Sequence, residues 1–242
     1  MMEHAVAKLV QAITDTQRPL SRRLGHAALL STMPDADDAC TGLLDTLHPE
    51  SQLGRGFREV LVTAGTNIDA LCVLLWESPS TQRAAVSRLT ELGDSSALPD
   101  LIALLQSMRE QPRRDLTGII RALEAIGACW IPGAFDAPRA VAAAVGDMDA
   151  TVRTVASANL RRMGADAAVA SEQLLQLLES PHTPVRFSVA ELLPDLTPPT
   201  VYVPWMVRLL HEDDDELIRW VARYELSRLS TPDPLVTEAL AA

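Results

Sequence analysis

The sequence predicts an all-α protein, an α-solenoid of about six to seven stacked antiparallel helical hairpins. Three observations lead to this fold class. A similar sequence recurs at 149–164, 182–197 and 215–230, at an interval of 33 residues. The repeated apolar positions follow one helix face, and no segment alternates apolar and polar residues with period two. A self-similar period between about 20 and 50 residues indicates stacked repeats.

Four apolar columns define the register of the three clearest repeats. Their offsets within a repeat are 0, 4, 8 and 11 positions, which follow one face of an α-helix. The columns contain Val152, Val185 and Ile218; Ala156, Val189 and Ala222; Leu160, Leu193 and Leu226; and Met163, Leu196 and Leu229. This face is the predicted core of the stack.

The elements are expected in order along the chain, beginning with a helix near 2–15. The predicted hairpins are 17–48, 51–78, 80–109, 112–147, 149–180, 182–212 and 213–241. The N-terminal helix and the first hairpin are irregular, because 17–48 matches only part of the column pattern. A hairpin cannot bury its apolar stripe alone, so residues 1–242 are predicted as a single repeat domain. The C-terminal segment 232–242 is expected to cap the stack.

Glycines follow the last apolar column in four repeats. They are Gly65, Gly93, Gly127 and Gly164. Glycine has no Cβ to clash in the left-handed conformation, so each is expected to close the first helix of its hairpin with a left-handed turn.

The repeated motif carries a family resemblance. Asp-x-x-Val-Arg-x-x-Ala-x-x-x-Leu-x-x-Met-Gly at 149–164, with its weaker copies, resembles HEAT repeats, particularly the short bacterial kind. The resemblance covers nearly the whole chain and implies a right-handed solenoid whose second helices line a concave side. HEAT arrays are generally surfaces that bind other proteins, although similar solenoids include bilin lyases and a class of alkylpurine DNA glycosylases.

Composition narrows the function. A chain of 242 residues with 48% hydrophobic residues can bury a sizeable core, and its formal charge is −11. This balance disfavours nucleic acid as a partner, because phosphate contacts need a basic stripe. The N-terminus has no signal-peptide pattern and no segment is apolar enough to span a membrane, so a cytoplasmic location is expected. Oligomeric state is left open.

Chemical motifs are scarce. Cys40, Cys72 and Cys129 are odd in number, lack a Cys-x-x-Cys pair and have apolar neighbours, so they are interpreted as structural thiols. The sequence has no nucleophile elbow, zinc-protease motif or phosphate loop. No cofactor, metal or catalytic residue is predicted. Whether the chain is an enzyme is left open, with a non-enzyme as the favoured interpretation.

The charged positions of the repeats have mainly structural interpretations. Arg153, Arg186 and Arg219 form one column, each a few positions after Asp149, His182 or Asp215. We expect these pairs to brace successive repeats, with ligand binding as the alternative. The acidic run at 212–216 precedes a helix, where carboxylates cap free N–H groups. Contact with a basic partner and metal binding are its alternatives.

The predicted partner-binding site lies on the second helices. Alignment of Leu177-Leu178 with Leu209-Leu210 places Trp205 in the column of Gln173 and Arg208 in that of Gln176. Tryptophan and arginine are enriched at binding hot spots. Trp205 is therefore expected to face a groove, or alternatively to fill a gap created by nearby prolines.

A second aromatic patch lies on a first helix. Trp220 and Tyr224 are four residues apart and lie off the core column. This patch is either a docking face or a surface covered by the terminal segment.

The resulting hypothesis is a protein–protein interaction scaffold or adaptor, with an inhibitor or neutralising partner of a basic protein as one candidate role. Negative charge would steer a basic partner. The rival is a DNA-repair enzyme similar to the alkylpurine DNA glycosylases, with Trp130 and Asp136, or Trp205 and Asp195, as aromatic and carboxylate. A role similar to that of bilin lyases is a further alternative, based on fold analogy alone.

Overall fold

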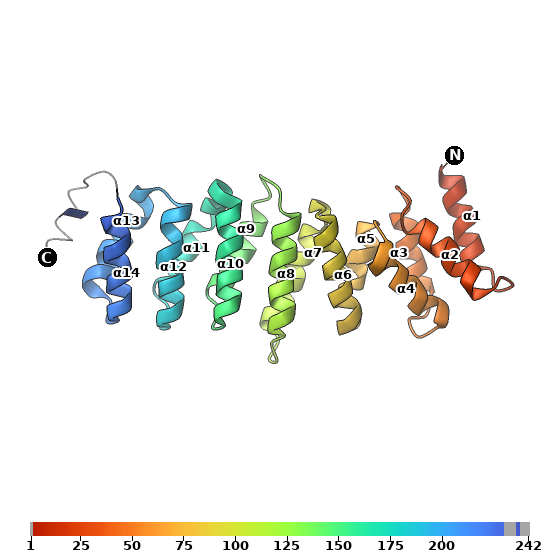
Figure 1. Cartoon of the computed structure of the whole chain (residues 1–242), viewed down its shortest axis with the longest axis horizontal. Coiled ribbons are helices and arrows are strands. Elements are labelled where there is room, and N and C mark those ends of the chain that lie inside the picture. The colour runs from red at the N-terminus through yellow and green to blue at the C-terminus, as the bar shows by residue number, and fades with distance from the viewer. Residues whose placement is uncertain (1, 230–235, 238–242) are drawn as a thin grey trace. The chain divides into compact units, whose positions relative to one another are not determined.

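The computed structural model describes residues 2–229 and 236–237 (Figure 1). Within these residues the regular elements are helices, packed in sequence as hairpins, which confirms the predicted all-α class. The chain divides into two compact units. Unit 1 contains residues 1–113 and 128–130, and unit 2 contains 114–127 and 131–242.

Unit 1 contains the N-terminal helix and the first three hairpins. Its elements are α1 (Met2–Thr14), α2 (Leu20–Leu30), α3 (Asp37–Thr46), α4 (Gln52–Ala64), α5 (Ile68–Leu74), α6 (Pro79–Leu92), η1 (Ser95–Ala97) and α7 (Leu98–Glu110). Helix α2 packs against α1 and α4, α4 packs against α6, and α3 packs against α5. The first helices of successive hairpins thus contact one another, as the repeat pattern predicted.

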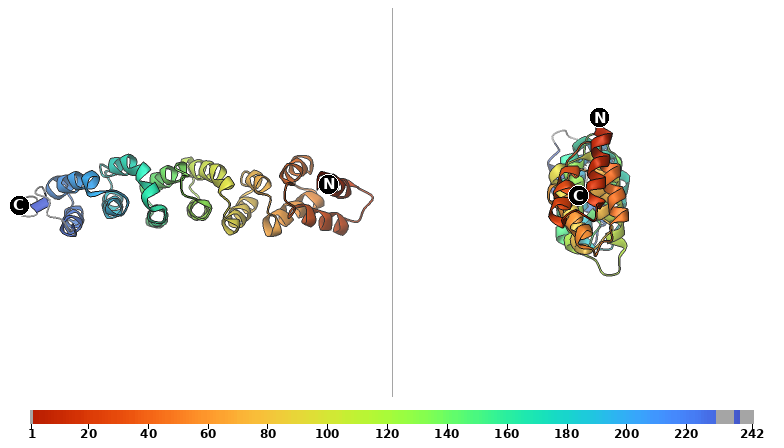
Figure 2. Two further views of the ribbon diagram at one scale, coloured as in Figure 1. Left: turned by 90° about the horizontal axis from the view of Figure 1, so that it is seen from above. Right: turned by 90° about the vertical axis from the view of Figure 1, so that its right-hand side faces the viewer.

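Unit 2 contains the most regular repeats. Its elements are α8 (Leu116–Cys129, the last two residues of which belong to unit 1), α9 (Asp136–Val145), α10 (Ala150–Met163), η2 (Gly164–Ala170), α11 (Ser171–Leu177), α12 (Thr183–Leu196), α13 (Pro199–Glu212) and α14 (Glu216–Ser227). Helices α10, α12 and α14 contact in sequence and form a first-helix layer. Helices α9, α11 and α13 form the second-helix layer, which the view from above separates from the first (Figure 2).

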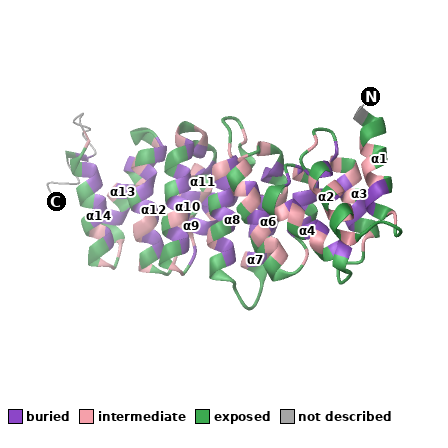
Figure 3. Ribbon diagram, turned by 45° about the vertical axis from the view of Figure 1, so that its right-hand side comes forward, coloured by how far each residue is buried: buried purple, intermediate pink, exposed green. Residues whose placement is uncertain are grey.

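The predicted columns form the core of unit 2. Leu160 and Leu193 are fully buried and Leu226 is 1% exposed. Members of the other columns are buried as well, except Leu229, which is half-buried. Buried residues lie along the sides of helices that face their neighbours, whereas outer sides are exposed (Figure 3). The core is therefore continuous from α10 through α12 to α14.

The predicted C-terminal cap lies outside the described residues, apart from Val236 and Thr237. Val236 is buried. The second helix of the predicted hairpin 213–241 also lies almost entirely outside the described residues. The single-domain organisation stays a prediction.

The glycine column is only partly confirmed. Gly93 adopts the left-handed conformation after α6, and Gly164 has a positive φ but extended ψ. The expectation was wrong for Gly65, which is extended, and for Gly127, which lies inside α8. A Cβ at Gly127 would clash with Asn159 of α10. The Asn159 and Arg162 side chains occupy the space beside Gly127, so this glycine suits close packing of α8 against α10 rather than a turn.

Buried thiols yield the first testable prediction. Cys40, Cys72 and Cys129 are free and buried. Burial raises the pKa of the Cys40 and Cys72 thiols to about 12 and that of Cys129 to about 11. Because the thiolate is the reactive form, none should react with an aromatic disulfide reagent in the native protein near neutral pH, and all should react after denaturation. Rapid labelling of any native thiol would contradict their structural role.

Candidate functional site

The predicted second-helix site is built around a contact between Trp205 and Arg208. Both belong to α13, where a spacing of three residues places them on neighbouring positions of one face. The guanidinium carbon of Arg208 lies 4.3 Å from the centroid of the Trp205 ring. An Arg208 nitrogen also lies 3.1 Å from a carboxylate oxygen of Glu179, just after α11. Arg208 therefore connects the indole to the preceding hairpin.

Exposure distinguishes the members of this site. Trp205 is half-buried, whereas Arg208 is exposed. On α11, Gln173 is half-buried and Gln176 is exposed, so each matches the residue aligned with it on α13. The half-buried Trp205 has one ring face covered by Arg208 and retains exposed surface. The arrangement can present an indole and an oriented cation to a partner.

Exposed carboxylates occur on and next to the helices that carry this site. Glu172 and Glu179 are exposed near α11, and Glu212 is exposed at the end of α13. A positively charged partner segment would meet more acids than bases on this part of the second-helix layer. Electrostatic steering by such a surface speeds encounter with a basic partner.

The second predicted patch is a stacked aromatic pair on α14. The rings of Trp220 and Tyr224 have centroids 5.5 Å apart and an interplanar angle of 9°. Arg228 places its guanidinium carbon 5.6 Å from the Tyr224 centroid. Trp220 and Tyr224 are 56% and 47% exposed. Trp220 and Tyr224 belong to the first-helix layer, whereas Trp205 and Arg208 belong to the second-helix layer. The residues predicted from the sequence therefore form two separate candidate surfaces and not one site.

Two members of the arginine column brace successive repeats, through partners other than those predicted: Arg153 donates to the Ser188 hydroxyl at 3.1 Å, and Arg186 donates to Asp213. Arg153, Arg186 and Arg219 each donate to the carbonyl six positions earlier, which precedes their own helix. Arg186 also donates to both carboxylate oxygens of Asp213 in the next repeat, at 2.9 and 2.8 Å. These hydrogen bonds raise the pKa of Arg186 above its ordinary value.

Pairing of these arginines with Asp149, His182 and Asp215 was therefore a wrong expectation. Asp149 accepts hydrogen bonds from the backbone at the start of α10. Asp215 does the same for α14, accepting from the Leu217 N–H, and also accepts from the Thr183 hydroxyl at 2.8 Å. Together with the Asp213 contact, this accounts for the acidic run by helix capping and inter-repeat bracing.

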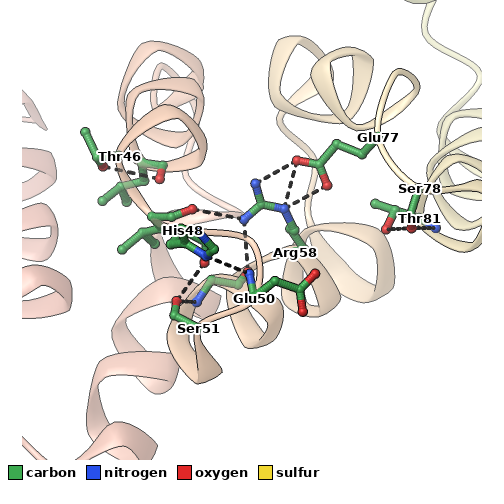
Figure 4. Close-up of polar contacts among 11 residues, drawn as sticks. Thr46, His48, Glu50, Ser51, Arg58, Glu77, Ser78 and Thr81 are labelled. Carbon is green, nitrogen blue, oxygen red and sulfur yellow. Dashed lines mark hydrogen bonds and ion pairs between the residues drawn. The ribbon is translucent and has the colours of Figure 1, made fainter.

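Unit 1 contains a polar cluster that the column analysis missed. Arg58 of α4 is 8% exposed and lies outside the arginine column. Its Nε lies 2.7 and 2.8 Å from the Glu77 carboxylate oxygens, and its Nη1 donates to the Leu47 and Gly54 carbonyls (Figure 4). The cluster borders a cleft of about 700 Å³. Arg58 thus connects the end of its own hairpin, at Glu77, with the Leu47 carbonyl of the preceding hairpin.

Residues considered for other chemistry have surroundings of different kinds, and the indole nitrogen of Trp130 is buried without a hydrogen-bond partner in the described part of the chain. Among the described residues, no group of three or more His, Cys, Asp or Glu side chains is arranged to hold a metal ion. Asp195 forms an ion pair with Arg161 at 2.7 Å. Asp136 is 90% exposed at its side chain and Trp130 is half-buried. No described helix combines the length and apolar character needed to cross a membrane.

Comparisons with known proteins matched solved structures alone. No family model and no curated protein matches the chain. Among solved structures, a chain of the complex of CpcE and CpcF of phycocyanin lyase from Nostoc is 21% identical, with 95% of this chain and 92% of that chain covered and a TM-score of 0.41. An archaeal HEAT-like repeats protein from Thermococcus onnurineus is 15% identical, with 97% and 93% covered and a TM-score of 0.41.

Human deoxyhypusine hydroxylase in complex with glycerol is also similar. It is 18% identical, with 99% of this chain and 94% of that chain covered and a TM-score of 0.34. The sequential hairpins and their buried columns define an all-α helical-repeat fold.

Proposed function

We propose that the protein is a binding scaffold that holds another protein, of basic character, against the second-helix layer of unit 2. The observation that carries this proposal is the contact between Trp205 and Arg208, with Arg208 held in place by Glu179. An oriented cation and a partly exposed indole need little ordering when a partner arrives, so less conformational entropy is lost on binding. The exposed Glu172, Glu179 and Glu212 on or next to α11 and α13, together with the net charge of −11, favour a basic partner.

Gln173 and Gln176 extend the proposed surface along α11. Their amides can both donate and accept hydrogen bonds, which suits a peptide or side-chain partner without adding charge. The scaffold needs no catalytic group for this role. An inhibitor of a basic protein would use the same surface.

The proposal predicts that Trp205→Ala/Arg208→Ala weakens partner binding by about 2 kcal/mol or more, roughly 30-fold. The partner is first isolated from lysate at low and moderate salt, and its affinity is then measured by titration calorimetry. Binding should also weaken as salt increases, because the attraction is partly electrostatic.

Arg208→Ala alone separates binding from folding. Arg208 and Glu179 are exposed, so losing their ion pair should cost at most about 1 kcal/mol of stability. Trp220→Ala/Tyr224→Ala is the matched control on the other layer and should leave partner affinity unchanged. The proposal fails if no protein partner is recovered at either salt concentration, or if the Trp205 and Arg208 variants bind normally. Unfolding of the Trp205 variant would favour the gap-filling interpretation.

A further inference from the structure

An apolar ridge runs along the outer face of α14. We define the α14 ridge as Leu217, Trp220 and Tyr224, which are 48%, 56% and 47% exposed. Their spacing places them on one side of the helix, while Ile218, Ala222 and Leu226 are buried on the other. Parallel stacking fixes the two aromatic rings against each other. The ridge is therefore preorganised and lies in an accessible position.

Charges along the ridge have opposite sign at its two ends. Glu216 is exposed in the first turn of α14, and Asp214, just before the helix, has a side chain that is 96% exposed. Arg223 and Arg228 are exposed toward the C-terminal end. Glu216 and Arg223 are seven residues apart, about two helical turns, so they share one edge of the ridge. This distribution is complementary to itself when the helix direction is reversed.

We propose that the α14 ridge binds the α14 ridge of a second copy of this chain in an antiparallel, two-fold arrangement. Such an arrangement brings Glu216 of each copy toward Arg223 of the partner subunit, and the two contacts are equivalent by symmetry. The aromatic pairs meet near the two-fold axis, and the antiparallel helix dipoles attract. The basic partner proposed for the second-helix layer fits this ridge poorly, because it would meet Arg223 and Arg228.

The expected dimer is weak and reversible. One helix face offers less area than the roughly 800 Å² per partner of a standard stable interface. The measured mass should therefore rise with protein concentration from 26.2 kDa toward twice that value. This surface lies on a different layer from Trp205 and Arg208, so failure of either proposal is detected independently of the other.

Sedimentation velocity of the full chain over a range of concentrations tests the dimer. Trp220→Ala/Tyr224→Ala should weaken self-association by roughly 30-fold or more, the effect of losing a hot spot of about 2 kcal/mol. Trp205→Ala/Arg208→Ala is the matched control and should leave it unchanged. Circular dichroism and melting curves verify that each variant is folded. A monomer at every concentration, or a dimer that survives loss of both ridge aromatics, overturns the proposal.

Charge reversal tests the antiparallel arrangement. Glu216→Arg and Arg223→Glu should each weaken the dimer by placing like charges together. Mixing the two variants should restore a heterodimer, because both symmetry-related contacts then join opposite charges. If each variant is monomeric but their mixture stays monomeric, the arrangement is wrong. If only deletion of residues 230–242 allows dimerisation, the terminal segment covers the ridge in the intact chain and the proposal is also wrong.

Discussion

Leu193→Ala is expected to lower the free energy of unfolding by about 2–5 kcal/mol. Leu193 is fully buried in α12, in the column it shares with Leu160 and Leu226. Truncation removes apolar contacts and leaves a cavity that helices on both sides cannot fill. Because each repeat is stabilised by its neighbours, amides of α10 and α14 should also lose protection from hydrogen exchange. Chemical denaturation and native-state exchange measure the two effects.

Leu29→Ala provides the same chemical change at a surface position. Leu29 of α2 is 59% exposed, so this substitution should change stability by no more than about 0.5 kcal/mol. An unchanged melting temperature for Leu193→Ala would show that the repeated column is not the core. Equal losses in both variants would show that burial does not determine the cost.

The hairpins were predictable because each first helix buries a regular face. The fourth apolar column, which contains Met163 and Leu196, predicted where α10 and α12 end, and both helices end at those residues. Local signals agreed with this pattern: Asp149 and Asp215 cap helices, and Pro199 begins α13. Helix ends and caps depend on residues that are close in the sequence, so one amino-acid sequence is sufficient to predict them.

Gly127 shows where local signals were insufficient. The pair Ile126-Gly127 has the same sequence appearance as Leu92-Gly93, yet α8 continues to Cys129. The amide of Asn159 donates to the Leu123 carbonyl at 2.7 Å, which brings α10 close to α8. The side chains that occupy the space beside Gly127 come from α10, so the local sequence does not indicate the role of this glycine.

The candidate surfaces were also predicted only in part: contacts within one helix were predictable, whereas contacts between helices were not. The spacing of Trp205 and Arg208, and that of Trp220 and Tyr224, correctly predicted neighbours on a helix face. Glu179 was not predicted as the partner of Arg208, because the alignment placed Gln176 in that column. Long arginine side chains reach several positions along an adjacent helix, so column register alone does not determine their partners.

Arg186→Ala is expected to lower the free energy of unfolding by about 3–5 kcal/mol. The Arg186 and Asp213 side chains are 9% and 6% exposed. Removing the guanidinium leaves the Asp213 carboxylate buried without its countercharge, and the Ser180 carbonyl loses a donor. The cost should therefore far exceed that of an exposed ion pair. Urea denaturation of the variant gives the measurement.

Arg161→Ala is the matched control, because Arg161 and Asp195 are each 45% exposed in a comparable pair between repeats. Its loss should cost no more than about 1 kcal/mol. Asp213→Asn keeps an oxygen that can accept from the Asp215 N–H while removing the charge. If Arg186 and Asp213 act as a pair, the double variant should lose less stability than the two single variants added together. Additive losses would mean that Arg186 stabilises the stack through its backbone contact, and that the ion pair with the next repeat contributes little.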